Sequence, residues 1–293
     1  MNKALILLYL IYIYYIGYEA FKHPYRYFDP LTSVVIPDSV TLIDEYAFSG
    51  NQISQVDLGV GGRGLSIYEY AFSNNKITSV DVRDVYRIYD YAFDNNQITG
   101  VLDLSGNTMV GSYAFSRNQI TSYIASDEWW DIPAGLFKNN KLTSIDIPDK
   151  TRVIGKEAFT GNQLTNIDLS ESNVEFIRDL SFHNNRLSSL VLPTDLVSIG
   201  PNAFSNNLDL REIDLPDTLM ELGGAAFANN QLTSIDIPQG ITEIKNFTFY
   251  GNKLTDVVLP SSVTVIGEAA FADNEIANIT IPENVISIGE LAF

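Results

Sequence analysis

Phenylalanine recurs along this 293-residue chain at a nearly constant interval, and that regularity limits the folds open to the chain. Ten of the twelve intervals between successive members are 21 to 23 residues, and the first two are 27 and 24. A fixed period of this length predicts a solenoid, in which each repeat buries its apolar face against its neighbours. The thirteen members of this Phe column are Phe21, Phe48, Phe72, Phe93, Phe115, Phe137, Phe159, Phe182, Phe204, Phe227, Phe249, Phe271 and Phe293.

Two further columns keep the same register. An aliphatic residue stands five positions before every Phe, from Ile16 and Ile43 to Ile288, and we expect it in the core with the Phe. Asn stands three positions after the Phe in all eleven internal repeats, for example at Asn75 and Asn96. Its two donors and one acceptor predict an inward ladder that satisfies turn backbone. A row of exposed polar ligands is the alternative.

A strand pattern follows each Asn, as in Leu142-Thr-Ser-Ile145-Asp-Ile147. Alternating aliphatic residues with Thr, Val and Ile predict a half-buried strand, and one strand per repeat predicts a parallel sheet. Proline cannot donate to a sheet, so it belongs at the strand boundary. It stands there in seven repeats, at Pro37, Pro148, Pro193, Pro216, Pro238, Pro260 and Pro282.

The full repeat is Leu-x-x-Ile-x-Ile-Pro-x-x-Val-x-x-Ile-Gly-x-x-Ala-Phe, which resembles the BspA-like branch of the leucine-rich repeats over nearly the whole chain. The resemblance implies a mainly β repeat solenoid, wound as a right-handed superhelix with a parallel sheet on its concave side. It also implies a secreted or cell-surface bacterial protein that adheres to other proteins or cells. The family often has Cys where this chain has its Asn column, a departure that keeps the turn role and removes thiol chemistry.

We expect residues 1–30 to form a degenerate N-terminal repeat or cap, and residues 31–293 to form repeats of about 22 residues. Lys3 and the apolar run after it within residues 1–16 could also be a signal sequence, but no small-x-small cleavage site follows. The run is too short for a membrane span. The last repeat stops halfway, at Phe293. This predicts either a longer chain or self-association through an uncapped C-terminal end.

Composition excludes several functions. The chain has no Cys, so disulfides, thiolate metal sites and Cys nucleophiles are excluded. Its two histidines, His23 and His183, are far apart, which argues against a His-based metal site. The net charge of −18 disfavours nucleic acid and anionic membranes and favours basic partners or cations. We expect no cofactor and no catalytic residues.

Three irregular segments invite functional interpretations. Tyr25, Arg26, Tyr27 and Phe28 could form an adhesive patch, although packing over the end of the solenoid is the simpler expectation. The Gly-rich loop 59–64 lacks the strand-before, helix-after setting of a phosphate site. Tyrosines recur at positions 68, 70, 86, 89, 91 and 113. We interpret them as packing on the side away from the main sheet, with an exposed aromatic row for carbohydrate as the alternative.

The only two tryptophans, Trp129 and Trp130, interrupt the repeat. Neighbouring side chains on an extended segment point in opposite directions. At least one Trp should therefore be exposed and could be a binding hot spot. In the other interpretation one Trp fills the core and the other covers it.

The outward position between the last two buried strand residues is acidic in seven of twelve repeats. Asp is a poor strand former, and like charges on neighbouring strands repel, so this carboxylate row requires a reason. We consider a stripe that attracts a basic protein, a weak Ca²⁺ site, and a charged face that prevents aggregation. A paired-carboxylate glycosidase lacks a unique pair here. The residues are Asp57, Asp81, Asp103, Asp146, Asp168, Asp214 and Asp236.

The sequence therefore predicts a non-enzymatic protein-binding or adhesion module that is extracellular or at the cell surface, with its partner on the acidic sheet. The rival prediction is a passive spacer within a larger surface protein. A binder should show one face with a coherent charge or aromatic pattern, whereas a spacer should show mixed faces.

Overall fold

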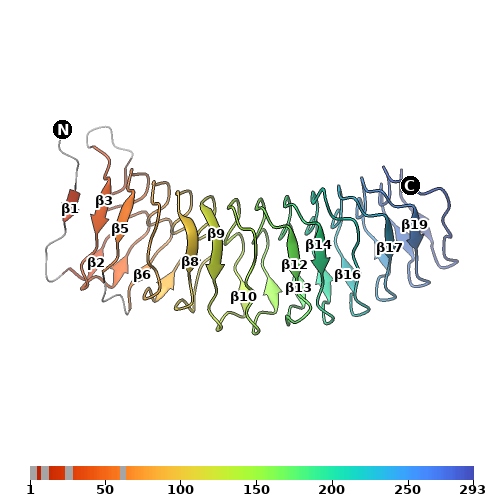
Figure 1. The fold of residues 1–293 in the computed structure, drawn as a ribbon, viewed down its shortest axis with the longest axis horizontal. Helices are drawn as coiled ribbons and strands as arrows, with labels where there is room; N and C mark the ends of the chain where they lie inside the picture. Colours follow the sequence, from red (N-terminus) through yellow and green to blue (C-terminus); the bar gives the residue numbers. More distant parts are fainter. Residues whose placement is uncertain (1–4, 8–12, 24–28, 60–63) are drawn as a thin grey trace. The chain divides into compact units, whose positions relative to one another are not determined.

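The computed structural model describes residues 5–7, 13–23, 29–59 and 64–293. Within these ranges it contains short parallel strands and no helix, so the predicted β solenoid is confirmed, with about 11 turns (Figure 1). The chain divides into two compact units. Unit 1 contains Met1–Trp129 and Pro133–Leu142, and unit 2 contains Trp130–Ile132 and Thr143–Phe293. Each unit is described by itself below.

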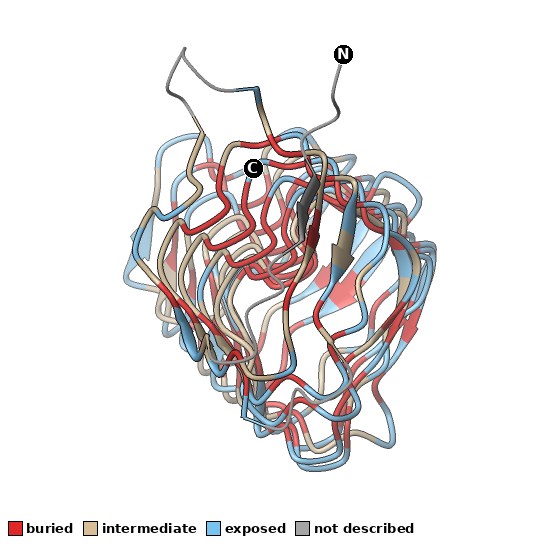
Figure 2. Ribbon diagram, turned by 90° about the vertical axis from the view of Figure 1, so that its left-hand side faces the viewer, coloured by how far each residue is buried: buried red, intermediate tan, exposed pale blue. Residues whose placement is uncertain are grey.

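Most coils carry strands on two sides, which we call the long-strand side and the short-strand side (Figure 2). On the long-strand side, unit 1 has β1 (Leu5–Leu7), β3 (Ser33–Val35), β5 (Gln55–Asp57), β8 (Thr99–Asp103) and β9 (Gln119–Ile124). Unit 2 has β12 (Asn166–Asp168), β14 (Ser189–Val191), β17 (Ser234–Asp236) and β19 (Asp256–Val258) there. The hydrogen-bonded orders are β1-β3-β5, β8-β9, β12-β14 and β17-β19, all parallel.

The short-strand side consists of two-residue strands. In unit 1 they are β2 (Tyr15–Ile16), β4 (Leu42–Ile43), β6 (Ser66–Ile67) and β7 (Arg87–Ile88). In unit 2 they are β10 (Asp131–Ile132), β11 (Val153–Ile154), β13 (Phe176–Ile177), β15 (Ser198–Ile199), β16 (Glu221–Leu222), β18 (Glu243–Ile244), β20 (Val265–Ile266) and β21 (Ser287–Ile288). The predicted aliphatic column runs through this side in register, with Ile43 paired to Ile67 and Ile154 to Ile177.

The Phe column forms the centre of the core in both units. In unit 1, neighbouring rings from Phe21 to Phe115 stack with centroids 5.1–5.3 Å apart. In unit 2, the rings from Phe159 to Phe293 stack at 5.2–6.0 Å. The internal members have essentially no exposed surface. Burying each ring contributes roughly 1.5–3 kcal/mol, so this column is a main source of stability.

The Asn column is the predicted inward ladder. Asn75 shows the pattern: its Nδ2 donates to the carbonyl oxygens of Phe48 (2.9 Å) and Phe72 (3.1 Å), and its Oδ1 accepts from the backbone N–H of Ile53 (3.1 Å). One side chain thereby connects two coils. The same arrangement recurs at Asn96, Asn118, Asn185, Asn230 and Asn252. Because a buried amide must be hydrogen-bonded, the ladder fixes the turn that follows each Phe.

Most coils enter the left-handed backbone region at two points, two residues before the Phe and two residues after it. In one coil these are Tyr70 (φ 59°) and Asn74 (φ 56°). Asn tolerates this conformation, whereas it costs a residue such as Tyr on the order of 1 kcal/mol. The backbone N–H of Tyr70 donates to the carbonyl of Asp90 in the next coil at 3.1 Å, which helps to hold the turn in place.

Three predictions fall wholly or partly outside the described residues. They concern residues 1–4 and 8–12 of the possible signal sequence, the patch at residues 25–28, and most of the Gly-rich loop, residues 60–63. Within the described part of the N-terminal segment, Tyr15 and Ile16 pair with Leu42 and Ile43, so these residues lie in the register of the repeats.

Candidate binding surface

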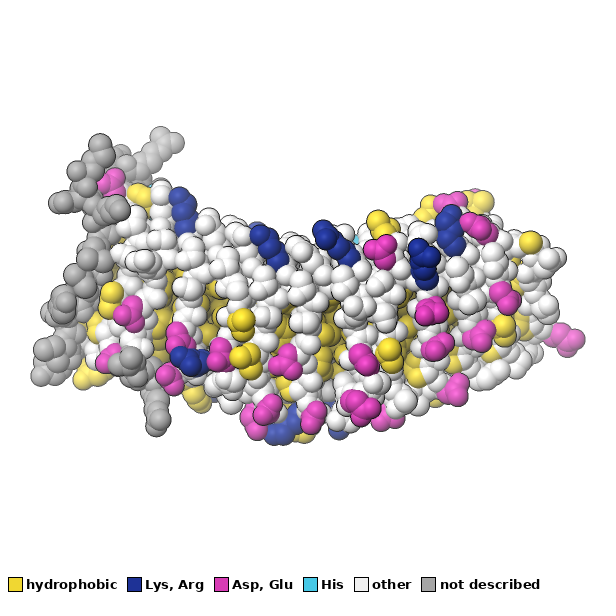
Figure 3. Space-filling model, viewed as in Figure 1, with side chains coloured by type: hydrophobic (Ala, Val, Ile, Leu, Met, Phe, Trp, Pro, Cys, Tyr) yellow, Lys and Arg dark blue, Asp and Glu magenta, His cyan; other side chains and the backbone are white. Residues whose placement is uncertain are grey.

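The long-strand side presents three polar rows in each unit. The carboxylate row is the one predicted from sequence, and a row of Ser and Thr runs beside it at positions such as Ser54, Thr121 and Ser188. These hydroxyls donate to carbonyl oxygens of the preceding coil at 3.2 Å, so they belong to the scaffold. Figure 3 shows carboxylates in a band on this face and Lys and Arg side chains mostly toward one margin.

The third row, of amides and cations, was missed by the sequence reasoning. It consists of the residue directly after ten of the eleven ladder Asn residues, and that fixed spacing was the available signal. Asn207 is instead followed by Leu208, and the last member, Glu275, is an acid that pairs with Lys253 at 3.2 Å. Lys76 Nζ donates to Gln52 Oε1 at 3.1 Å, and Lys141 Nζ donates to Gln119 Oε1 at 2.9 Å. In most coils this row lies five residues before the carboxylate row, with a spacing of six residues between Gln97 and Asp103. Five residues correspond to roughly 16 Å along an extended segment. Its members are Gln52, Lys76, Gln97, Gln119, Lys141, Gln163, Arg186, Gln231, Lys253 and Glu275.

All seven predicted Asp side chains reach solvent. Six are exposed, and Asp103 is half-buried. Strand register places Asp103 beside Ile124, Asp168 beside Val191, and Asp236 beside Val258. The row therefore includes exposed apolar side chains among its carboxylates. A surface of this kind can attract a basic partner and also bury some of its apolar area.

Four members of the row close the turn that follows them. In each case Oδ1 accepts a hydrogen bond from the backbone N–H two residues later. The donors are Gly59 for Asp57 (2.9 Å), Arg83 for Asp81 (3.2 Å), Ser105 for Asp103 (3.0 Å) and Ser170 for Asp168 (3.0 Å). This side-chain turn is a common local use of Asp. These four carboxylates therefore have a structural role, whatever else they do.

The other three cannot make that bond, because the residue two positions later is a proline without an N–H. They are Asp146 before Pro148, Asp214 before Pro216, and Asp236 before Pro238. Asp146 has other interactions. In unit 2, therefore, closing the turn does not explain why Asp occupies positions 214 and 236.

Asp214 and Asp236 lie on neighbouring coils together with two more acids. Backbone hydrogen bonds from Gln231 to Leu210 (2.8 Å) and from Thr233 to Arg211 (3.2 Å) set the two coils side by side. Ser234 and Asp256 pair in register on β17 and β19, and Glu212 occupies the corresponding position one coil earlier. We call Glu212, Asp214, Asp236 and Asp256 the unit 2 acidic patch. All four side chains are exposed.

Arg83 partly neutralises the carboxylate row in unit 1. Its Nε donates to Asp81 Oδ1 at 3.0 Å and its Nη2 donates to Asp81 Oδ2 at 2.6 Å. The guanidinium holds the pKa of Asp81 below its usual value, and the side-chain hydrogen bond is the largest cause. Asp57, Asp81 and Arg83 also line a cavity of about 310 Å³. The net field of this region is consequently weaker than the number of its carboxylates suggests.

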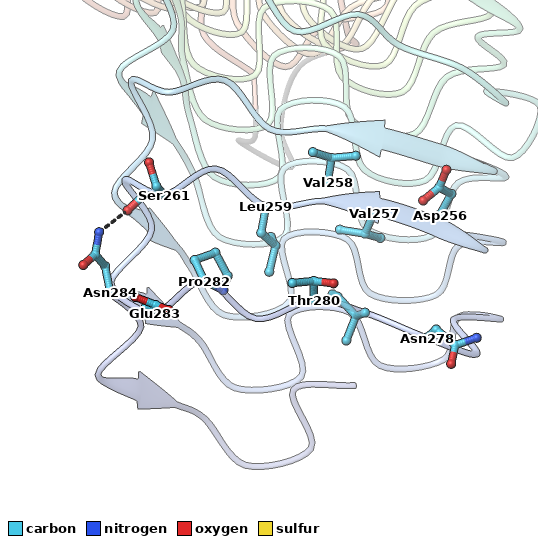
Figure 4. A pocket seen from close by; sticks show the side chains of 11 residues that line it. Asp256, Val257, Val258, Leu259, Ser261, Asn278, Thr280, Pro282, Glu283 and Asn284 are labelled. Atoms are coloured by element: carbon cyan, nitrogen blue, oxygen red, sulfur yellow. Dashed lines mark hydrogen bonds between the residues drawn. The ribbon is translucent and has the colours of Figure 1, made fainter.

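A hollow of about 910 Å³ lies between β19 and residues 278–284 (Figure 4). Asp256 and Glu283 lie toward opposite ends of it, and Val257 and Leu259 are among the apolar residues that line it. The side chain of Asn284 donates to the carbonyl of Ser261 at 2.8 Å. Because no Lys or Arg lines this hollow, it continues the acidic character of the neighbouring patch.

The two tryptophans differ. Trp129 is only 4% exposed, and its Nε1 donates to the carbonyl of Asn107 at 2.7 Å within unit 1. It fills the core, so including it among the binding residues was wrong: a buried indole cannot contact a partner. Trp130 is 66% exposed in unit 2, where its carbonyl accepts from the N–H of Arg152 at 2.9 Å. Only Trp130 remains a candidate contact.

Other chemistry finds little support in the described part of the chain. No group of three or more His, Asp or Glu side chains there is arranged to hold a metal ion. His183 Nδ1 lies 2.7 Å from Ser205 Oγ, a pairing that resembles a nucleophile and its base. Ser205 is only 2% exposed, and its hydroxyl also bonds to the carbonyl of Asn202 at 3.0 Å. This pair is therefore packing between coils.

Parallel coils connected by a buried Asn ladder define a protein of the leucine-rich-repeat class. The chain belongs to the BspA-type leucine-rich repeat family, whose model for a "BspA type Leucine rich repeat region (6 copies)" matches residues 14–139, 130–253 and 175–293. Repeat proteins of this family are commonly protein-interaction modules and are typically non-catalytic. No curated protein matches the sequence.

Solved structures support the same fold. A leucine-rich repeat protein from Bacteroides ovatus superposes with a TM-score of 0.67 at 21% identity, covering 94% of this chain and 78% of that one. The pneumococcal vaccine antigen PcpA gives 0.54 at 18% identity, covering 94% and 79%. A leucine-rich repeat protein from Eubacterium ventriosum gives 0.53 at 15%, covering 90% and 76%. At these identities the likeness concerns the fold alone. Within the described residues, no helix is long and apolar enough to cross a bilayer.

Proposed function

We propose that this chain is a protein-binding module that holds a partner with a basic surface on the long-strand side of unit 2. The observation that supports the proposal is the presence of Asp214 and Asp236 before prolines, where neither carboxylate can close its turn. Like charges on neighbouring strands cost stability. An acidic pair without a role in the turn is more easily explained by a partner than by the fold.

The three rows make the two margins of this surface chemically different. A partner that lies along the strand direction would meet carboxylates at one margin and amides with Lys or Arg at the other, roughly 16 Å away. Complementary charge mainly sets orientation and association rate. Such an ordered pattern favours a binder over the rival hypothesis of a passive spacer, which predicts mixed faces. Val191 and Val258, 44% and 53% exposed, supply apolar contact area within the carboxylate row.

Membership of the BspA-type family supports a setting outside the cell or on its surface, where this module would contribute to adhesion. Trp130 is a second candidate contact, on the short-strand side. The acidic patch leads the proposal because an exposed Trp alone does not specify the chemistry of its partner.

The test uses the full chain and a fluorescein-labelled lysine-rich peptide as the probe. We expect Asp214→Asn/Asp236→Asn to weaken binding about fivefold to tenfold at low salt, and we expect the difference to shrink at high salt. The matched control is Glu243→Gln/Glu268→Gln, which removes two exposed charges elsewhere in unit 2. Equal losses in the two double variants would reduce the effect to net charge and contradict a specific patch.

A further inference from the structure

Unit 1 carries a second aromatic column besides the buried Phe rings. Tyr46, Tyr70, Tyr91 and Tyr113 each stand two residues before a column Phe, on four successive coils. Their rings stack with centroids 4.8, 4.7 and 4.9 Å apart and interplanar angles of 1°, 4° and 2°. This spacing equals the separation of neighbouring β-strands, so the solenoid itself sets the rings in contact. All four side chains are half-buried.

The stack has defined ends. Lys22 Nζ lies 4.2 Å from the ring centroid of Tyr46, and Lys138 Nζ lies 5.9 Å from that of Tyr113. The next coil has Gly135 at the equivalent position, where an added Cβ would come within 2.1 Å of the Tyr113 ring. The glycine therefore leaves room for that ring. Because the inner ring faces are covered by other rings, the alternative of a carbohydrate platform loses the faces that it needs.

A second pair lies on the same two central coils. Tyr68 and Tyr89 each stand four residues before a column Phe, with ring centroids 4.4 Å apart and an interplanar angle of 27°. The pKa of the Tyr68 phenol is raised, first by its hydrogen bond with the Tyr89 phenol. Both rings of this pair are half-buried.

We propose that these tyrosines are a site of oxidative cross-linking, in which a peroxide-using one-electron oxidant joins neighbouring coils of unit 1 through dityrosine. Each of two neighbouring phenols gives up one electron and its phenolic proton. The two radicals join through ring carbons next to the phenol oxygens, and the hydrogen on each of those carbons moves through solvent to the phenol oxygen. The pair loses two hydrogen atoms in total, and one molecule of hydrogen peroxide accepts them to form two molecules of water.

The geometry favours particular pairs. Tyr68 and Tyr89 need the least rearrangement, because their rings are already inclined and closest together. Members of the stacked column must tilt toward one another, and their outer edges have room to do so because they are only half-buried. The chain has no Cys, so a disulfide cannot make a covalent connection between coils. Each coil of a solenoid contacts only its neighbours, and a covalent bond between neighbours opposes unravelling.

The experiment treats the full chain with a haem peroxidase and limiting hydrogen peroxide. We expect dityrosine fluorescence, a monomer lighter by two hydrogen atoms per bond, and tandem mass spectra that assign the first bond to Tyr68–Tyr89. Oxidised protein should melt at a temperature higher by roughly 5 °C, because a cross-link restricts the unfolded chain. Tyr89→Phe should abolish the first bond while it keeps a stacked ring.

Two controls make the result decisive. Tyr86→Phe removes an exposed neighbouring phenol that stacks on no tyrosine in the described structure, and it should leave the product unchanged. Phe is tolerated two residues before the column Phe, since Phe247 occupies that position with φ 60°, so Tyr70→Phe/Tyr91→Phe should fold and lose the bonds of the column. Dityrosine formed only between molecules, only at Tyr14, Tyr15 or Tyr86, or not at all would overturn the proposal.

Discussion

The two units end most of their long strands differently. In unit 1, Asp57, Asp81 and Asp103 each use a carboxylate oxygen to accept the backbone N–H two residues later. In unit 2, proline ends the strand in every coil except that of Asp168, and the acids before the prolines cannot form this bond. The same column of the repeat thus has a structural role in unit 1 and at Asp168, but not where proline follows the acid in unit 2. Identity of residue type along a repeat does not establish identity of role.

The turn two residues before the Phe differs as well. Unit 1 fills it with four stacked tyrosines, whereas unit 2 has Glu157, Leu180, Asn202, Ala225, Phe247, Ala269 and Leu291 there. All of these residues adopt a left-handed backbone in both units. The conformation is therefore imposed by the coil, and the tyrosine stack is an addition specific to unit 1.

The largest expected effect tests whether the two units share one kind of core. Phe93→Ala and Phe204→Ala each remove a fully buried ring that stacks on two neighbours. Each variant should lose about 3–5 kcal/mol of unfolding free energy, since a buried Phe is replaced by a cavity. Urea denaturation followed by circular dichroism measures both losses. A much smaller loss in one unit would mean that its coils do not depend on the Phe column.

A smaller effect separates the two kinds of Asp. Asp103→Ala removes the acceptor for the Ser105 N–H (3.0 Å) and hydroxyl (2.6 Å), and should cost about 1 kcal/mol. Asp214→Ala removes an exposed acid before Pro216 and should change stability by no more than about 0.5 kcal/mol. Thermal melts of the two variants under identical buffer conditions provide the measurement. Equal destabilisation would remove the distinction on which the proposed binding patch rests.

The smallest effect concerns the one Asp of unit 2 that closes its own turn. The Ser170 hydroxyl is the largest cause of the lowered pKa of Asp168. Ser170→Ala should raise that pKa toward its ordinary value, as followed by a carboxyl-carbon NMR titration. A folded-state pKa below the unfolded value gives stability that is present above about pH 4 and lost as the pH falls through the folded pKa. The variant should therefore be less stable than the parent at neutral pH and equal to it in strong acid. An unchanged titration would show that the backbone N–H alone suffices.

Much of the candidate site could be predicted from the chain. The spacing of Asp57 to Asp236 predicted that every member faces outward, because side chains of a strand alternate between two faces. All seven side chains do reach solvent, although Asp81, Asp146 and Asp214 lie outside the assigned strands. The distinction between Asp-x-Pro and the Asp-x-Gly, Asp-x-Arg and Asp-x-Ser segments was also present in the sequence. Its meaning depends on the turn geometry, which only the structure shows. The amide and cation row was not predicted, because its residue type varies from coil to coil whereas the neighbouring Asn is constant.

The repeat spacing alone determined that this chain winds into a solenoid with a Phe core and an Asn ladder. A column of apolar residues at a fixed interval can be buried only by stacking one coil on the next. Only the tertiary structure decided that Trp129 is buried while Trp130 is exposed, and that the tyrosines of unit 1 stack face to face. Those outcomes depend on which coil lies beside each side chain and at what angle. The sequence of a single repeat does not specify these contacts between coils.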